Sequence, residues 1–189
     1  ITLNAMGALR TLLAQREGLI DNNKWAPLWV VDFPLFEKDD KNNFAPLHHP
    51  FTAPRDEDEN LLDTDPSKIK SIAYDIVMNG YELGGGSIRI HDSKIQKKIF
   101  RILGISDQEA EEKFGFLMNA FKYGAPPHGG MAFGFDRIVM LLANCTQIRD
   151  VIAFPKTQTA SDLLFGSPDV ISEDQLDELS INIIIEEEE

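Results

Sequence analysis

The segment "SIAYDIVMNGYELGGGSIRIHD", residues 71–92, restricts the possible folds of this chain more than any other. Its two runs of β-branched and aromatic residues are typical of β-strands. Glycine weakens a strand interior and marks a bulge, a bend or a place where another group comes close. We therefore predict two β segments joined by a glycine-rich bend at Gly84–Gly86, with another group passing close to these glycines.

The rest of the chain predicts helices and strands in mixed order. Apolar residues at Met6, Leu9, Leu12 and Leu13 have helical spacing. We expect a strand over residues 26–40 with its proline at an edge or bulge position, a proline-rich loop over 42–58, helices over 94–104 and 107–124, a short strand and an apolar helix over 129–145, and a buried strand over 147–155. This order predicts an α+β fold, with a mostly antiparallel sheet flanked by helices.

Composition excludes several classes of protein. The net charge is −13 and the pI is near 4.7, which argues against non-specific binding to nucleic acid or to anionic membranes, although a local basic pocket is compatible with it. The acidic runs 55–65 and 186–189 are expected to be solvated surface. Cys145 is the only cysteine, so we expect no intrachain disulfide, a reducing cytoplasmic location and, without a long apolar run, no membrane association.

Two acidic residues near the glycines form a candidate metal site. With a period of two, Asp75 shares a face of its strand with Val77 and Asn79. Glu82 follows on the neighbouring β segment. Two carboxylates can hold Mg²⁺ together with the phosphates of a substrate. The alternative is that these acids face solvent without a function.

Two arginines are candidates for anion binding. Arg89 lies between Ile88 and Ile90, which we expect to point to the opposite, buried face; an arginine there can bind a carboxylate through two hydrogen bonds, or it is a surface residue. Arg137 falls in the first turn of the helix that begins near Phe135. A cation there opposes the helix dipole unless an anion sits beside it. The alternative is a salt bridge from Arg137 to Asp136 or Glu82.

Two adjacent histidines complete the set of candidate residues. His48 and His49 are expected on opposite sides of an extended segment fixed by Pro50. The four histidines of the chain have no regular metal-ligand spacing, which argues against a zinc site. A histidine that lines a pocket is the remaining functional role.

Four of these segments together resemble the bacterial-type aspartyl branch of the class II aminoacyl-tRNA synthetases. The resemblance covers residues 4–156 and includes the family's motif 3 at Gly130–Arg137, where Ala132 replaces a glycine found in many class II enzymes. The matching segments are "LHHPFTAP", "AYDIVMNGYELGGGSIRIH", "KFGFLMNAFKYGAPPHGGMAFGFDRIVMLL" and "IRDVIAFPK".

The resemblance implies a role for each candidate residue. Arg89, Arg137 and Glu82 would be the catalytic residues. The implied ligands are the γ-phosphate of ATP for Arg137, the adenine for Gly134, Phe135 and Asp136, Mg²⁺ on the ATP phosphates for Asp75 and Glu82, and the amino acid for Arg89 and His48, with His49 as a second candidate. The implied reaction is activation of L-aspartate with ATP, followed by transfer to tRNA(Asp), in a homodimeric full-length enzyme.

The chain departs from the family by what it lacks. Motifs 1 and 2, the anticodon-binding β-barrel and the loop that closes over substrate have no counterpart in it. The resemblance implies that residues 1–20 are the exit of an insertion domain, that residues 21–160 are the C-terminal part of the catalytic domain and that residues 161–189 are a C-terminal extension. We therefore expect half of an active site, inactive by itself.

Three alternatives to this interpretation remain open. One is a relative that activates or forms asparagine, and the second is a non-catalytic module that kept the fold. The third is a structural acidic domain, in which Arg137 would only pair with Asp136. Retention of Glu82, Arg89 and Arg137 argues against the second alternative.

Overall fold

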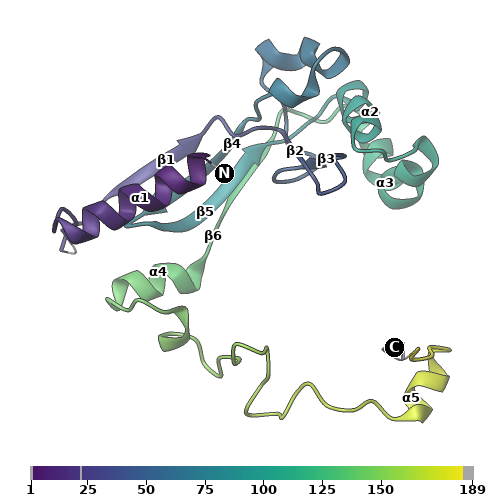
Figure 1. Cartoon of the computed structure of the whole chain (residues 1–189). Coiled ribbons are helices and arrows are strands. Elements are labelled where there is room, and N and C mark those ends of the chain that lie inside the picture. Colours follow the sequence, from purple (N-terminus) through teal and green to yellow (C-terminus); the bar gives the residue numbers. More distant parts are fainter. Residues whose placement is uncertain (1, 22, 185–189) are drawn as a thin grey trace. The chain divides into compact units, whose positions relative to one another are not determined.

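The computed structural model describes residues 2–21 and 23–184 and has an α+β fold (Figure 1). The chain forms two compact units, residues 1–137 and 138–189. The elements are helix α1 (Thr2–Arg16), strands β1 (Pro27–Val31), β2 (Phe36–Lys38) and β3 (Phe44–Pro46), 3-10 helices Asp56–Asp63 and Pro66–Lys68, strands β4 (Ala73–Met78) and β5 (Tyr81–Ile88), helices α2 (Ser93–Ile102) and α3 (Asp107–Phe121), strand β6 (Gly129–Phe133), helix α4 (Phe135–Leu142), 3-10 helix Ile148–Asp150 and helix α5 (Glu173–Glu178).

A four-stranded antiparallel sheet in the order β1-β4-β5-β6 forms the centre of the first unit. The turn between β4 and β5 is made by Asn79 and Gly80, both with positive φ, 53° and 85°. An Asn-Gly pair favours this kind of hairpin turn because both residues tolerate positive φ. The predicted bend at Gly84–Gly86 is therefore wrong, and these glycines lie inside β5.

The group that comes close to the glycines is the protein itself. A side chain on Gly86 would collide with the backbone carbonyl of Gly130 in β6, and one on Gly84 would collide with the carbonyl of Ala132. A side chain on Gly85 would instead meet the carboxylate of Asp75. The glycines thus let β6 approach β5 on one side and let the Asp75 carboxylate lie over β5 on the other.

A β-bulge changes which face of the sheet Glu82 occupies. Ile76 pairs with Gly84, but the next residue, Val77, pairs with Glu82, so Leu83 has no partner in β4. Such an extra residue shifts the alternation of side chains by one position. Because Glu82 lies opposite Val77, it joins the face that also carries Asp75.

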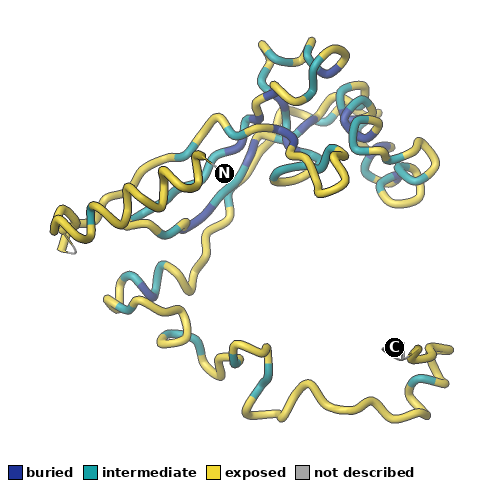
Figure 2. Tube along the Cα trace, viewed as in Figure 1, coloured by how far each residue is buried: buried dark blue, intermediate teal, exposed yellow. Residues whose placement is uncertain are grey.

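The core of the first unit lies at the end of the sheet where α2 and α3 pack together, as the buried segments in Figure 2 show. Ring contacts join Phe51 to Phe100 and Phe114, with centroids 5.2 to 5.8 Å apart. The buried apolar cluster consists of Leu35, Phe36, Leu62, Ile69, Ile90 and Ile99. The chain from His48 to Thr52 runs beside this core, which gives it a rigid support.

Helix ends and two strands show how far the sequence pattern holds. Asp92 caps α2 and Ser106 caps α3 through their side chains. The strand predicted over residues 26–40 is divided into β1 and β2, because Asp32 between them adopts a positive φ of 66° and its carboxylate pairs with Arg55. Helix α1 forms as predicted, but it buries none of its described residues.

The buried strand predicted over residues 147–155 is wrong. This segment contains the 3-10 helix Ile148–Asp150, and it joins no sheet among the described residues. Phe154 is 68% exposed and has a positive φ of 56°, a conformation that β-strands do not use. The acidic run 186–189 lies outside the described residues. In the part of the chain that the structure describes, no helix combines the length and the apolar character that crossing a membrane requires.

Candidate active site

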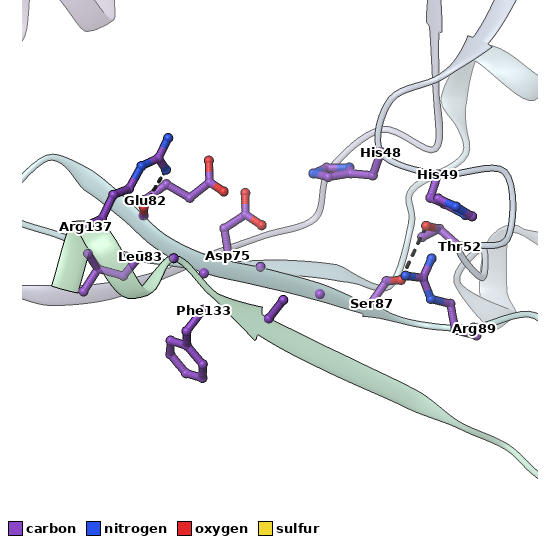
Figure 3. A pocket seen from close by; sticks show the side chains of 15 residues that line it. His48, His49, Thr52, Asp75, Glu82, Leu83, Ser87, Arg89, Phe133 and Arg137 are labelled. Carbon is purple, nitrogen blue, oxygen red and sulfur yellow. Dashed lines mark hydrogen bonds between the residues drawn. The ribbon is translucent and has the colours of Figure 1, made fainter. Parts of the chain in front are cut away.

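One cavity of about 530 Å³ lies on the face of the sheet that carries Asp75 and Glu82 (Figure 3). Its size falls within the range of pockets that bind small molecules. The lining residues are His48, His49, Thr52, Asp75, Glu82, Leu83, Gly84, Gly85, Gly86, Ser87, Arg89, Ala132, Phe133, Gly134 and Arg137. Seven residues singled out from the sequence therefore meet in one place: His48, His49, Asp75, Glu82, Arg89, Gly134 and Arg137.

The carboxylates of Asp75 and Glu82 form the acidic end of the cavity. They project in the same direction from β4 and β5 in Figure 3. The pKa of Asp75 is raised above its ordinary value of 3.8, first by burial and then by the neighbouring Glu82, while His48 opposes this change. The Glu82 charge makes the Asp75 carboxylate more costly to ionise, and a cation placed between them would favour the charged form.

The acidic end fits magnesium better than zinc. Among the described residues, no group of three or more His, Cys, Asp or Glu side chains could hold a metal ion. Magnesium is commonly held by one or two carboxylates together with substrate phosphates and water, whereas zinc takes three or four protein ligands. Asp75 and Glu82 would therefore hold Mg²⁺ only together with a ligand that brings its own oxygen atoms.

Arg137 lies next to this acidic end but does not neutralise it. The side chain projects from the first turn of α4, and its Nη1 donates a hydrogen bond of 2.7 Å to the backbone carbonyl of Glu82. The predicted alternative of a salt bridge to Asp136 or to the Glu82 carboxylate is not formed in the described structure. The exposed guanidinium therefore has donors left for an anion. Phe135 and Asp136 are exposed and do not line the cavity.

Arg89 forms the opposite end of the cavity. Its backbone pairs with Thr52 in an isolated antiparallel bridge, and its Nη1 is buried without a hydrogen-bond partner in the described structure. A buried charged donor without a partner is costly, so the geometry favours an anionic ligand there. Of its two neighbours, Ile90 is buried as predicted, but Ile88 is 36% exposed, so the prediction for Ile88 is wrong.

Each histidine rests against an aromatic ring. His48 contacts Phe33 edge-on with ring centroids 4.6 Å apart, and His49 contacts Phe51 at 5.2 Å. The Nδ1 of His49 also accepts a hydrogen bond from the Phe51 amide, at 3.2 Å. The pKa of His49 is lowered by burial and then by the nearby Arg89 charge. Burial and the Arg89 charge both disfavour the charged form of His49, and His48 faces the carboxylates from across the cavity.

The family model described as "tRNA synthetases class II (D, K and N)" matches residues 7–158 of this chain. The chain belongs to this family of class II tRNA synthetases. The match includes every residue that lines the cavity. The antiparallel sheet with flanking helices is thus a class II synthetase fold.

Curated relatives share more than half of their aligned residues with this class II chain. The aspartate–tRNA ligase of Staphylococcus epidermidis is 55% identical over 184 residues, which are 97% of this chain and 31% of that protein. The aspartate–tRNA ligase of Macrococcus caseolyticus is 56% identical over 98% of this chain, and the aspartate–tRNA(Asp/Asn) ligase of Caldanaerobacter subterraneus is 54% identical over 97%. The chain spans about a third of the length of these relatives, 31% in each case.

Solved class II structures share the fold at low sequence identity. An aspartyl-tRNA synthetase from Entamoeba histolytica has a TM-score of 0.54 and 24% identity, covering 79% of this chain and 25% of that one. An asparaginyl-tRNA synthetase from the same organism, in complex with asparaginyl-adenylate, has a TM-score of 0.53 and 22% identity over 72% of this chain and 26% of that one. At this identity, these likenesses show the fold alone.

Two buried hydroxyl groups of this class II site were not selected from the sequence. Thr52 and Ser87 are 2% and 3% exposed, and their Oγ atoms lie 3.4 Å apart beside Arg89. Ser87 could have been found, because it lies two positions before Arg89 and therefore shares its face. Thr52 could not, because only its isolated bridge to Arg89 brings it there.

Proposed function

We propose that this chain provides the phosphate-binding and aspartate-binding half of an aspartate-activating site. The observation that carries the proposal is one cavity whose two ends both carry charged side chains that the protein itself does not neutralise. At one end, Arg89 presents a buried donor without a partner in the described structure. At the other end, Asp75 and Glu82 lie beside Arg137. ATP fits the second end and an amino acid with an anionic side chain fits the first.

The proposed chemistry depends on positioning and charge. The α-carboxylate of aspartate attacks the α-phosphorus of ATP, the bond to the β-phosphate oxygen breaks, and pyrophosphate leaves. A hydroxyl of the terminal adenosine of tRNA then attacks the aspartyl carbonyl, the bond to the α-phosphate oxygen breaks, and AMP leaves. Asp75 and Glu82 would hold Mg²⁺ together with the ATP phosphates, and the ion would offset part of the negative charge of the phosphates. Arg137 would bind the γ-phosphate, with Gly134, Phe135 and Asp136 beside the adenine, so no covalent nucleophile from the protein is needed.

Arg89 favours aspartate over asparagine as the amino acid. A carboxylate can accept two parallel hydrogen bonds from a guanidinium, whereas a carboxamide offers only one acceptor oxygen and places its own donors next to the cation. His48 and His49 would line the same amino-acid site. The proposal includes tRNA(Asp) as the second substrate, a homodimeric full-length enzyme and a cytosolic location, in keeping with the single cysteine.

A chimeric enzyme tests the proposal directly. The chain replaces the matching segment of the Staphylococcus epidermidis aspartate–tRNA ligase, to which it is 55% identical over 184 residues. We expect exchange of labelled pyrophosphate into ATP with aspartate, and none with asparagine or lysine. A folded chimera without exchange would contradict the proposal and favour the non-catalytic alternative. Exchange with asparagine instead would favour the asparagine-activating alternative.

The Arg89→Ala variant of this chimera tests the role of Arg89. We expect a loss of about 10²-fold or more in kcat/KM for aspartate, as for removal of one preorganised donor from an anion site. The matched control is Arg101→Ala, which removes an exposed arginine that pairs with Asp107 on the surface. A loss in kcat/KM below about tenfold for Arg89→Ala would show that Arg89 does not bind the substrate.

The chain by itself is expected to bind ATP with Mg²⁺ but not to catalyse exchange. Within the described residues, Arg89 and Arg137 are the arginines that line the cavity, and they lie at its two ends. No lysine of the described residues lines the cavity. The described residues therefore offer no further lysine or arginine side chain to the α-phosphate between the two arginines. Detectable aspartate-dependent exchange by the chain alone would contradict this expectation.

A further inference from the structure

Gln96 is a fully buried polar residue in α2 whose position no reaction step explains. It is 0% exposed, and its Nε2 donates a hydrogen bond of 2.8 Å to the carbonyl of Pro50. Its Oε1 is buried without a partner in the described structure. Burying an amide whose oxygen has no partner costs free energy, so packing alone does not explain a glutamine here. The hydrogen bond to Pro50 is therefore the contact to examine for a functional role.

Pro50 lies at the centre of the histidine loop, residues 48–52. The loop is closed by a hydrogen bond of 3.0 Å from the Thr52 amide to the His49 carbonyl. On one side it is fixed to the segment that follows β5, because the Ile90 amide donates to the carbonyl of Phe51 at 2.9 Å. On the helical side, the direct hydrogen bond to the loop comes from Gln96.

The acidic end of the cavity is held by other means. Asp75 and Glu82 are presented by the paired strands β4 and β5, and Arg137 is hydrogen-bonded to the backbone of Glu82. None of these contacts passes through the histidine loop. A change at Pro50 would therefore displace the amino-acid end of the cavity and leave the phosphate end in place.

We propose that Gln96 is a positioning residue that sets the amino-acid end of the cavity by holding the histidine loop over Arg89. This inference rests on the proposed function for its substrate. Without the amide donor, the Pro50 carbonyl loses its partner and the loop relaxes away from α2. His49 and Thr52 then shift relative to Arg89, so aspartate binds more weakly while ATP binds as before.

Kinetics of the Gln96→Leu chimera test this proposal, with Gln108→Leu as the matched control. Gln108 lies on α3, is exposed, and bonds to the Glu112 carboxylate at 2.9 Å. For Gln96→Leu we expect the KM for aspartate to rise about tenfold, the upper range for one hydrogen bond, and the KM for ATP to stay within about twofold. For Gln108→Leu, both values should equal those of the parent chimera.

A second measurement does not depend on activity. NMR titration of the histidine rings in the 189-residue chain reports the environment of His49 directly. In Gln96→Leu the pKa of His49 should move up toward its ordinary value, because a relaxed loop exposes the ring and moves it away from Arg89. In Gln108→Leu it should not move. Gln96→Met, which keeps an unbranched side chain of similar length, replaces Gln96→Leu if the latter does not fold.

The outcomes separate this inference from the proposed function. A parent chimera without exchange contradicts the proposed function, and the NMR titration then still tests whether Gln96 positions the loop. An active parent in which a folded Gln96 variant shows an unchanged KM for aspartate, or equal rises for aspartate and ATP, overturns the inference. An unchanged pKa of His49 in a folded Gln96 variant overturns it as well.

Discussion

At the scale of single residues, the two arginines of the cavity differ in how they are held. Arg89 has a buried Nη1 without a partner in the described structure, whereas Arg137 is exposed and rests on a backbone carbonyl. Loss of Arg89 therefore changes both a binding site and a buried surface. Loss of Arg137 removes charge without disturbing the core, so Arg137 gives the cleaner test of phosphate binding.

The Arg137→Ala chimera should lose about 10²-fold or more in kcat/KM for ATP, because the γ-phosphate loses its charged donors. Its free energy of unfolding should stay within about 0.5 kcal/mol of the parent, since the side chain is exposed. Pyrophosphate exchange and urea unfolding measure the two quantities. A nearly unchanged rate would show that Arg137 does not contact the phosphates, and a large loss of stability would show a structural role instead.

The raised pKa of Asp75 predicts how stability changes with pH. The folded chain keeps the Asp75 proton to a higher pH than the unfolded chain does, so this group makes folding less favourable as pH rises from 3.8 through the folded pKa. Asp75→Asn should therefore give a flatter stability profile above pH 3.8 and equal or greater stability at neutral pH. Urea unfolding of the 189-residue chain across this pH range measures it. A less stable Asp75→Asn variant at neutral pH would contradict this account.

Residue chemistry in the sequence was sufficient to select the charged residues and the histidines of the cavity. Asp75, Arg89 and the histidines stand out because they are titratable side chains in extended segments, where the two-residue period indicates the face on which each lies. Thr52 does not stand out, because threonine is ordinary in a loop and only a tertiary bridge places it beside Arg89. Site residues that a local sequence pattern marks can be predicted, whereas residues that reach the site by pairing between distant segments cannot.

At the scale of secondary-structure elements, β5 combines three glycines with two different steric constraints. The missing side chains of Gly84 and Gly86 make room for the backbone of β6, whereas the missing side chain of Gly85 makes room for the carboxylate of Asp75. Backbone cannot yield easily, but a carboxylate can rotate. The same substitution at neighbouring positions should therefore have different effects.

Gly86→Ala should lower the free energy of unfolding by about 1–3 kcal/mol, because the new methyl group collides with the Gly130 carbonyl. Gly85→Ala should cost less stability and instead weaken the binding of ATP with Mg²⁺, since it displaces the Asp75 carboxylate. Urea unfolding and calorimetric titration of the 189-residue chain distinguish them. Gly130→Ala, whose methyl group would meet nothing within 4 Å, is the stability control. Equal stability losses for Gly85→Ala and Gly86→Ala would contradict this steric assignment.

Helices and the main hairpin could be predicted from local signals, but the sheet geometry could not. Asp92 and Ser106 cap their helices through rules that depend on neighbouring residues only. The Asn79–Gly80 turn had an equally strong local signal, which the glycine triplet obscured. The bulge at Leu83 has no such signal, because an additional leucine in a strand looks like any other residue until its partner strand is known.

At the scale of the whole molecule, the sheet ends in two strands that each pair on one side only. Among the described residues, β1 pairs with β4 and β6 pairs with β5. The exposed side chains of β1 include Leu28, Trp29 and Val31. Unpaired edges with apolar side chains promote association between chains, even at a net charge of −13.

The 189-residue chain should therefore self-associate as its concentration rises, and Leu28→Lys should reduce this association by placing a charge on the β1 edge. Sedimentation velocity over a concentration series measures it. Leu3→Lys, at an exposed position of helix α1 and not on a strand, is the control and should have little effect. A chain that stays monodisperse at all concentrations would show that the strand edges are protected in some other way.

The bulge at Leu83 also limits how this site can change or be transplanted. In an unbroken strand, residues separated by an odd number of positions can never meet on one side of the sheet, and Glu82 and Arg89 are separated in that way. The additional residue cancels the mismatch. Deleting Leu83 would therefore remove the bulge and place the acid an even number of positions from the arginine, so both would stay on one face. A designer who copies both residues onto a regular hairpin must move the acid by one position to recover the same pocket.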